Sequence, residues 1–421
     1  SMRNLVTRLL AAVLVVCLTT TVSAEDWVQF RGDGGLGTSS ENGLATTWSS
    51  AENIVWKAEM PGPGASSPIT LGERVFITCY SGYGLKPNEG EQKDLVRHLL
   101  CLRRKDGSVI WDKKFEPKLP EHKYQGEGAY HGYAASTPTT DGQRLYVFFG
   151  KSGVFCFDLD GKQLWQTTAG EGTNRWGSGC SPVLYKNLLI VNASVESGSL
   201  VALDKLTGAE VWQTGGIGSS WNTPVLVPSK ERTELVVSIA NHIVSVNPDS
   251  GKELWRAEGV HRYVCPSVVY HDDVVYAIGG GHTSLAVRIG GSGDVTTTHG
   301  LWRLNKGSNV SCPIYYEGHL YWTRDGSIAC CQNPATGEMV YEERFQPGTG
   351  TIWSSPVLAD GKLYYVSQSK GTFVVAAQPK FKLLAHNVLE EDDSRTNASP
   401  AVSNGQLFLR TDRSLYCIGD R

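Results

Sequence analysis

Residues 202–212 read Ala-Leu-Asp-Lys-Leu-Thr-Gly-Ala-Glu-Val-Trp, and this spacing returns along the chain. Residues 245–255 and 331–341 repeat it: a small residue, then Asn, then Ser or Thr, then Gly, and a final aromatic side chain. An Asp or Asn side chain accepts hydrogen bonds from N–H groups of its own turn, and glycine supplies a positive φ. The pattern therefore predicts a tight turn and then a strand whose last aromatic ring is buried against a neighbouring unit.

Each of these segments belongs to a longer repeat that opens on a small residue followed by proline. From the second proline onward the interval is 42 to 47 residues, and the first interval of 70 residues contains an insertion. Within a repeat, short apolar runs alternate with polar or glycine turns, as antiparallel strands require. This period predicts an all-β, eight-bladed β-propeller with tryptophan-docking motifs and one four-stranded blade per repeat. The anchor prolines are Pro68, Pro138, Pro182, Pro224, Pro266, Pro313, Pro356 and Pro400.

The eighth repeat lacks one strand, and a matching strand stands near the other end of the sequence. After Pro400 the chain offers three apolar runs and no final Trp. Residues 53–58, Asn-Ile-Val-Trp-Lys-Ala, precede the first anchor and carry Trp56 as a fourth strand would. We expect this strand to complete blade eight, because a closed ring leaves no open sheet edge. The propeller then spans 53–421 and follows an N-terminal extension at 25–52.

Residues 1–24 have the pattern of a secretory signal peptide. A basic start is followed by an apolar run at 9–18 and by small residues before position 25, and this run is too short to span a membrane. Ser1 precedes Met2 and is interpreted as a cloning remnant. Cys17 follows a valine where lipoprotein signals have a small residue, so no lipid anchor is expected. The sequence predicts an exported protein that resides in a periplasm.

The composition restricts the class of partner. The net charge is −3 and the pI about 6.4, and no basic stripe appears, which argues against nucleic acid. Beyond the leader no apolar run is long enough for a membrane span. We expect a monomer.

The nine cysteines beyond the leader are predicted to be free thiols. Cys101 and Cys331 occupy the strand position that Ala202 holds, and Cys265 and Cys312 precede anchor prolines. Exported proteins often pair their cysteines, but these positions suit small buried residues.

Candidate binding residues gather in the links that join one blade to the next. Such links lie on the same face as the loops between second and third strands, whereas tight turns at Asp272 and Glu317 belong to the opposite face. Aromatic, Arg and Asn side chains just before the anchor prolines converge at the channel mouth, as a binding funnel requires; some could instead fill a wide channel. Insertions at 81–96 and 116–134 lie on this face and could form a lid. The candidates are Tyr130, His131, Arg175, Trp176, Trp221, Asn222, His261, Arg262, Trp353, Arg395 and Asn397, with Tyr133, Tyr263 and Asn309 beside them.

Signatures of catalysis and metal binding are missing from the sequence. Neither His-Glu-x-x-His, Cys-x-x-Cys nor Gly-x-Ser-x-Gly occurs, and the Gly-x-Gly-x-x-Gly at 32–37 follows no strand. The sequence predicts no catalytic residue and no metal site.

The repeated Ala-x-Asp-x-x-Thr-Gly-x-x-x-Trp segment resembles the tryptophan-docking motif of quinoprotein propellers. The opening Asp-Trp-Val-Gln-Phe-Arg-Gly at 26–32 resembles the start of exported PQQ-like repeat proteins of planctomycete bacteria. The resemblance implies a PQQ-like propeller, a family that includes PQQ-dependent alcohol dehydrogenases and the non-catalytic BamB-type outer-membrane assembly proteins. The dehydrogenases hold calcium with Glu, Asn and Asp side chains and place a vicinal disulfide against the cofactor. Here the Cys330-Cys331 pair falls in a third strand, and the links contain few acids.

The sequence favours an exported, non-catalytic scaffold that binds a protein or polysaccharide partner through its loop-rich face, with no cofactor. Two alternatives stay open. One is a PQQ- and calcium-dependent alcohol or sugar dehydrogenase. The other is a carbohydrate-binding or carbohydrate-active propeller with Trp176, Trp221 and Trp353 as sugar platforms.

Overall fold

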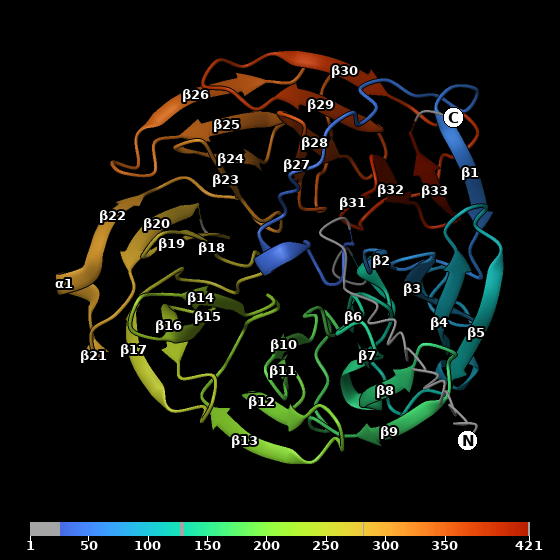
Figure 1. The fold of residues 1–421 in the computed structure, drawn as a ribbon, viewed down its shortest axis with the longest axis horizontal. Helices are drawn as coiled ribbons and strands as arrows, with labels where there is room; N and C mark the ends of the chain where they lie inside the picture. Colours follow the sequence, from blue (N-terminus) through green and yellow to red (C-terminus); the bar gives the residue numbers. More distant parts are fainter. Residues whose placement is uncertain (1–25, 127–129, 281, 420–421) are drawn as a thin grey trace, which may run out of the picture.

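The computed structural model describes residues 26–126, 130–280 and 282–419. In this part of the chain the strands form eight sheets, arranged as blades around a central axis (Figure 1). Four antiparallel strands make the body of each blade, and the blades follow the sequence repeats one to one. The predicted all-β, eight-bladed propeller is thereby confirmed. The leader at 1–24 lies outside the described residues.

The first four blades run in chain order from their innermost to their outermost strand. Blade 1 holds β2 (Ile69–Leu71), β3 (Arg74–Ser81), β4 (Val96–Arg103) and β5 (Val109–Phe115); blade 2 holds β6 (Thr139–Thr140), β7 (Arg144–Phe148), β8 (Val154–Asp158) and β9 (Gln163–Thr167); blade 3 holds β10 (Val183–Tyr185), β11 (Leu188–Ala193), β12 (Ser199–Asp204) and β13 (Glu210–Gly215); blade 4 holds β14 (Val225–Pro228), β15 (Thr233–Ile239), β16 (His242–Val246) and β17 (Glu253–Glu258).

The other four blades continue around the ring, and a few short elements decorate it. Blade 5 holds β18 (Val269–His271), β19 (Val274–Gly279), β20 (Thr283–Arg288) and β22 (Gly300–Leu304); blade 6 holds β23 (Ile314–Tyr316), β24 (His319–Arg324), β25 (Ile328–Gln332) and β26 (Met339–Arg344); blade 7 holds β27 (Val357–Ala359), β28 (Lys362–Val366), β29 (Thr372–Ala376) and β30 (Leu383–Asn387); blade 8 holds β31 (Ala401–Ser403), β32 (Gln406–Arg410), β33 (Ser414–Ile418) and β1 (Ile54–Glu59). The short elements are η1 (Asp33–Gly35), η2 (Gln92–Asp94), η4 (Gly150–Ser152), β21 (Gly293–Asp294) and α1 (Thr296–His299).

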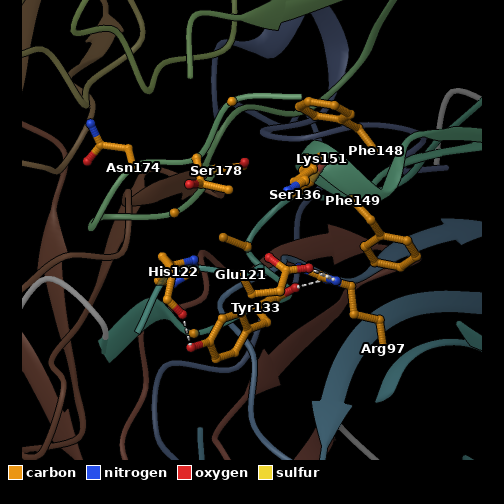
Figure 2. Close-up of a pocket in the computed structure, with 16 residues that line it drawn as sticks. Arg97, Glu121, His122, Tyr133, Ser136, Phe148, Phe149, Lys151, Asn174 and Ser178 are labelled. Atoms are coloured by element: carbon orange, nitrogen blue, oxygen red, sulfur yellow. Dashed lines mark hydrogen bonds and ion pairs between the residues drawn. The ribbon is translucent and has the colours of Figure 1, made fainter. Parts of the chain in front are cut away.

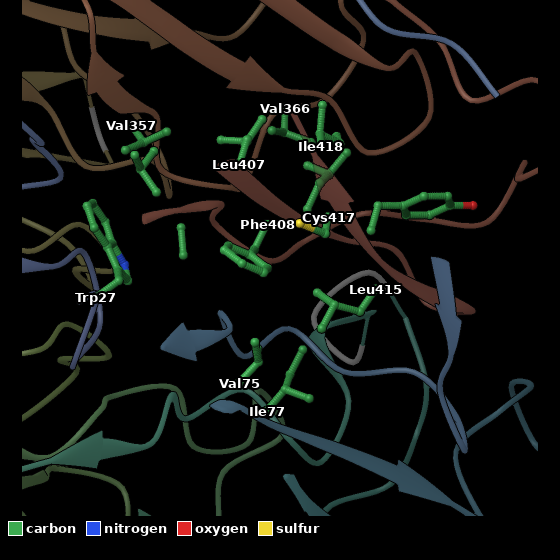
Figure 3. Close-up of a cluster of buried hydrophobic side chains, with 14 of the residues drawn as sticks. Trp27, Val75, Ile77, Val357, Val366, Leu407, Phe408, Leu415, Cys417 and Ile418 are labelled. Atoms are coloured by element: carbon green, nitrogen blue, oxygen red, sulfur yellow. The ribbon is translucent and has the colours of Figure 1, made fainter. Parts of the chain in front are cut away.

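Blade 8 is built from both ends of the chain, as the sequence predicts. Strand β1 pairs antiparallel with β33 and places Trp56 opposite Cys417. Below this pairing a large apolar cluster joins blades 7, 8 and 1, and Figure 3 shows Phe408 and Leu415 near Val75 in it. The ring is therefore closed by hydrogen bonds and by shared apolar burial.

The repeated motif makes the contact between neighbouring blades. Trp212 in β13 covers the turn of blade 4, where its Nε1 donates to the Pro248 carbonyl at 3.0 Å. Gly251 in that turn has φ 71°, and a Cβ on it would lie 2.4 Å from the indole, so both the turn and the ring above it require glycine. The same donation to a carbonyl of the next blade is made by Trp56, Trp111, Trp165 and Trp302.

Blade 4 departs from this scheme because its neighbour lacks the usual turn. Between β20 and β22 the chain forms β21 and α1, and β21 pairs in parallel with β17. Trp255 is fully buried, but its Nε1 donates to the Glu234 carboxylate of its own blade at 2.6 Å. The motif at 245–255 therefore forms the predicted turn, while its Trp finds a different hydrogen-bond acceptor.

Blade 7 has no aromatic residue at the docking position, and the N-terminal extension supplies one. Ala385 pairs with Val374 as Trp212 pairs with Ala202. The Trp48 ring stacks on Tyr364 of β28 with a centroid distance of 6.2 Å and is 4% exposed. In other blades the docking Trp packs on the equivalent second-strand aromatic ring, as Trp165 does on Tyr146. Trp48 therefore takes the place of the missing docking tryptophan.

The rest of the extension, blue in Figure 1, crosses the middle of the ring. The carbonyls of Trp27 and Val28 accept hydrogen bonds from the N–H groups of Thr70 and Thr140, in the first strands of blades 1 and 2. Thr38 bridges to Leu358 in blade 7. Arg31 is 2% exposed and donates to the Pro313 carbonyl of blade 6 at 2.6 Å. The extension thus fills the axis on the side of the tight turns.

The nine described cysteines are all unpaired, and only Cys265 is more than marginally exposed. Cys101 and Cys417 lie in third strands, where burial raises their pKa to about 12. This agrees with the prediction of buried free thiols.

Candidate functional site

The first group of candidate residues lies where three inter-blade links meet on the loop-rich face. The Arg395 guanidinium carbon lies 4.0 Å from the ring centroid of Tyr130, and the Tyr130 and Trp353 centroids are 6.4 Å apart. Asn397 donates to the Tyr130 carbonyl at 3.0 Å and accepts from Gln368 at 2.6 Å. These residues come from the links that follow blades 1, 6 and 7, so only the closed ring brings them together. We call them the Arg395 group.

A second group forms on the links that follow blades 2 to 5. The ring of Tyr263, 39% exposed, stacks on Trp176 and meets Trp221 edge-on, both with a centroid distance of 6.4 Å. Its hydroxyl donates to Asn309 at 2.8 Å, and Arg175 lies 5.1 Å from the Trp176 ring. We call this set the Tyr263 group. Among the described residues no hydrogen bond or ring contact joins it to the Arg395 group, so the face carries two aromatic patches.

The remaining candidates lie apart from both groups. His261 pairs with Glu258 at 3.0 Å and is exposed, as is its neighbour Arg262. Asn222 is 2% exposed, and its amide donates to the Ser238 carbonyl at 2.6 Å. His131 is half-buried beside Gly177. The structure thus places Asn222 in the framework beneath the face rather than on it.

The two blade-one insertions pack on each other. Tyr83 from the first contacts Tyr133 from the second at a centroid distance of 5.6 Å, and Tyr124 joins the same apolar cluster with Leu95. Gln92 exchanges hydrogen bonds with the backbone of Glu121. The described parts of the two insertions therefore form one packed layer.

Beneath this layer lies a narrow polar cavity of about 20 Å³ that the sequence did not reveal (Figure 2). Arg97 and Glu121 form an ion pair at 2.8 Å with both side chains almost fully buried. Arg97 also donates to the Tyr133 carbonyl and to Ser152. The volume suits a single water molecule. In the sequence only the insertion pointed to this cavity. The pairing of an arginine in β4 with a glutamate in the insertion could not be predicted, because the two residues belong to no common sequence pattern.

His122, which lines this cavity, and Glu196, which is bonded to the lining residue Ser178, have strongly shifted pKa values. Burial, with His131 and Arg97 nearby, lowers the pKa of His122 to about 3, so the imidazole is neutral; its Nε2 makes no hydrogen bond within the described structure. Burial raises the pKa of Glu196 to about 7, against the stabilising hydrogen bond from Ser178. A pKa of about 7 leaves this carboxyl partly protonated near neutral pH.

Residues 26–126, 130–280 and 282–419 contain no cluster of His, Cys, Asp and Glu side chains of the kind that binds metal ions. Over the same residues no helix is both long and apolar enough to cross a membrane.

Eight four-stranded blades, tryptophan docking between them and a blade built from both ends of the chain define the class of PQQ-like repeat propellers. The family model described as outer membrane protein assembly factor BamB matches residues 91–216 and 196–419. The chain belongs to this family.

Individual relatives agree on the architecture and differ in activity. The outer membrane protein assembly factor BamB of Burkholderia pseudomallei is 22% identical over 379 residues, which is 86% of each chain. The crystal structure of BamB from Moraxella catarrhalis superposes with a TM-score of 0.60 at 12% identity, covering 87% of this chain and 97% of that one. Quinohemoprotein alcohol dehydrogenase from Comamonas testosteroni gives 0.64 at 10% identity, covering 94% and 81%. At such identities the structural likeness establishes the fold alone.

Proposed function

We propose that this protein is an exported, non-catalytic scaffold that captures a protein partner through its loop-rich face. The observation that carries the proposal is the Arg395 group. Its guanidinium lies on the Tyr130 ring, and within the described residues it makes no hydrogen bond or ion pair. Arginine in this state keeps its forked set of donors for a ligand while the aromatic ring holds its orientation.

The chemistry of the face indicates what kind of partner segment would bind. Arg, Trp and Tyr are the residues that most often dominate protein interfaces, and the two patches supply all three types. Arg175 and Arg395 each lie over an aromatic ring, and their guanidinium groups are unpaired within the described residues. A guanidinium binds a carboxylate with two parallel hydrogen bonds. We therefore propose a partner segment that carries Asp or Glu beside an apolar side chain.

The opposite face offers less for a partner. Its strands are joined by tight turns such as those at Asp272 and Glu317, and the N-terminal extension fills its centre. The relative from Burkholderia pseudomallei is described as an outer membrane protein assembly factor, which supports a protein partner and a location in the cell envelope for this chain. The dehydrogenase alternative has weaker support, since Cys330 and Cys331 are free thiols in β25 and are not joined in a vicinal disulfide.

The test is capture of a partner by purified protein, followed by reconstitution with that partner in purified form. We expect the double variant Trp221→Ala, Arg395→Ala to weaken the reconstituted complex at least about tenfold while the melting temperature changes little. Asp272→Asn with Glu317→Gln is the matched control on the opposite face and should bind as the parent does.

Two outcomes would contradict the proposal. One is loss of binding only in the control pair, which would place the interface on the tight-turn face. The other is saturable binding of PQQ with Ca²⁺ together with dye-linked oxidation of an alcohol or sugar, which would establish the dehydrogenase alternative.

A further inference from the structure

Blade 1 holds a serine, a histidine and an aspartate that are joined in one line of hydrogen bonds. The Ser81 hydroxyl lies 2.9 Å from Nε2 of His98, and Nδ1 of His98 lies 3.0 Å from the Asp112 carboxylate. The three residues come from β3, β4 and β5. They project from the same face of the sheet, because Cys79 pairs with His98 and Leu100 pairs with Asp112. A nucleophilic serine is recognised by this geometry, in which a base lies about 2.6–3.2 Å from the hydroxyl and a third group orients the base.

The hydrogen bonds fix the direction in which a proton can move. An ionised carboxylate only accepts hydrogen bonds, so the Asp112 carboxylate holds a proton on Nδ1 of His98 and leaves Nε2 as the acceptor for the Ser81 hydroxyl. Among the described residues, Ser81 Oγ and the Asp112 carboxylate have no other hydrogen bond or ion pair. His98 is 4% exposed, whereas Ser81 is half-buried at the end of β3 on the loop-rich face. The base is thereby held in place, while its serine remains partly open to solvent.

The same positions in blade 3 show what a structural bond between these strands looks like. Ser199 and Gln213 occupy the places of His98 and Asp112 and are joined by a hydrogen bond at 2.9 Å. A hydroxyl and an amide hold the two strands together, but neither belongs to the side chains that act as general bases. Blade 1 has a base and its orienting carboxylate at these positions, and a serine of a third strand beside them. A contact between strands needs only the simpler pair.

The neighbours of Ser81 favour its hydroxyl as the nucleophile. Cys79 lies opposite His98 in β3, but burial raises the pKa of its thiol to about 12, so the thiol stays protonated. Gly82 follows Ser81 with φ 82°, and a Cβ there would overlap the Asp94 carbonyl oxygen, so this position requires glycine. The Gly82 N–H makes no hydrogen bond within the described residues. In α/β-hydrolases the N–H after the nucleophile receives the charge of the acyl oxygen, and this N–H is available for that role.

We propose that Ser81 is a nucleophilic serine that accepts the acyl group of small carboxylic esters. Ser81 Oγ attacks the ester carbonyl carbon, and His98 Nε2 takes the hydroxyl proton. The bond from the carbonyl carbon to the leaving oxygen then breaks, His98 gives the proton to that oxygen, and the acyl group stays on Ser81 as an ester. Attack by water in place of the alcohol releases a carboxylic acid and restores the hydroxyl. Asp112 is a positioning residue, because it touches only the imidazole.

The inference goes beyond the proposed capture of a partner, which remains a binding event on the loop-rich face. It uses none of the residues of the Arg395 or Tyr263 groups, so either proposal can fail alone. Partner binding by Ser81→Ala should therefore equal that of the parent.

The test treats full-length protein with two reagents. A fluorophosphonate probe forms a stable bond to a nucleophilic serine with loss of fluoride, and peptide mass spectrometry locates it; p-nitrophenyl acetate reports acyl transfer by release of p-nitrophenolate. We expect the probe on Ser81, and we expect Ser81→Ala to abolish both reactions. His98→Gln should slow labelling at least about a hundredfold, since a general base contributes about that factor or more. Asp112→Asn should slow labelling at saturating probe at least about tenfold in a variant that keeps the unfolding midpoint of the parent.

Ser108→Ala is the matched control. This serine is exposed in the same blade, and its hydroxyl donates to the Asp106 carboxylate and to no imidazole in the described structure, so the variant should react as the parent does. The unfolding midpoint of each variant separates loss of reactivity from loss of fold. Three results would each overturn the inference: no probe on Ser81 of the native parent, labelling that folded His98→Gln leaves unchanged, or equal release of p-nitrophenolate by the parent and by Ser81→Ala.

Discussion

Two seams of the ring, each the contact between two neighbouring blades, are covered by tryptophans from different parts of the chain. Between blades 3 and 4 the docking tryptophan is part of the repeat, and Trp212 donates its N–H to the Pro248 carbonyl. Between blades 7 and 8 the repeat has only Ala385 at the docking position. The extension supplies Trp48 instead, and the backbone N–H of Trp48 donates to Asn387, 339 positions further along the chain. The first seam is encoded locally, whereas the second exists only when the extension is present. The extension is therefore a structural part of the propeller.

The strongest test of this difference deletes the N-terminal extension together with β1. Deletion of residues 26–60 takes away Trp27, Trp48 and Trp56, which are all buried, and opens the edge of β33. Truncation of one buried Trp costs about 3–5 kcal/mol, and a whole domain is stable by only about 5–15 kcal/mol. We expect no stable monomer, as judged by size-exclusion chromatography and thermal unfolding.

A shorter deletion provides the control. Removal of residues 26–38 takes the axial segment but leaves Trp48 and β1, so the ring should stay closed with a smaller loss of stability. A monomer with unchanged melting temperature after deletion of 26–60 would show that the extension is dispensable.

The next test compares the two tryptophans directly. We expect Trp212→Ala and Trp48→Ala each to lower the free energy of unfolding by about 3–5 kcal/mol. Trp48→Ala should lie at the lower end, because its indole N–H makes no hydrogen bond to the described residues. The sites share no partner, so their effects should add in the double variant. Leu206→Ala, an exposed position, should change stability by less than about 0.5 kcal/mol. Urea unfolding measures all four, and a Trp48→Ala variant as stable as the parent would refute the equivalence of the seams.

Blades 3 and 8, one from each seam, also carry a buried carboxyl in the loop between their second and third strands. Burial raises the pKa of Glu196 in blade 3 to about 7. Burial also raises the pKa of Asp412 in blade 8, but only to about 6, since the charges of Arg410 and Arg395 act in the opposite direction. In both cases the folded protein binds its proton more tightly than the unfolded chain does. The stabilisation is complete at low pH and is lost as pH rises, between about 4.5 and 7 for Glu196.

The pH prediction is tested with Glu196→Gln, which keeps an acceptor for Ser178 and removes the ionisation. We expect the parent to lose on the order of 3 kcal/mol or less between pH 4.5 and 8 through this group, and the variant to lose correspondingly less. Asp412→Asn should flatten the curve over a lower pH range. Urea unfolding at a series of pH values checks both, and identical pH profiles for parent and Glu196→Gln would contradict the assignment.

The sequence was sufficient for most of the fold because each blade repeats its own turn chemistry and strand pattern. It predicted the eight blades, the strand at 53–58 and the thiols of Cys101 and Cys331 in third strands. It did not predict the role of Trp48, since the extension contains no repeat; the only signal was the missing aromatic residue in the outer strand of blade 7.

The sequence was less informative about the candidate site. It indicated which links converge on one face, because topology alone decides that. It could not tell that the candidates divide into two groups, or that Arg97 and Glu121 pair beneath the insertions. Contacts of this kind join loops with no shared pattern, and their geometry depends on the exact path of the insertions.

The finest test of the two seams replaces each tryptophan by phenylalanine. Trp212→Phe leaves the Pro248 carbonyl without its donor at a buried position, and such a loss costs about 1–3 kcal/mol. Trp48→Phe removes an N–H that has no partner in the described structure, so the lost ring area is offset by removal of an unpaired polar group. We therefore expect Trp48→Phe to change the free energy of unfolding by less than about 1 kcal/mol, and less than Trp212→Phe does. Urea unfolding measures the difference. If both replacements destabilise equally, the indole of Trp48 has a hydrogen-bond partner in the free protein, and the two seams are closer in chemistry than their geometry indicates.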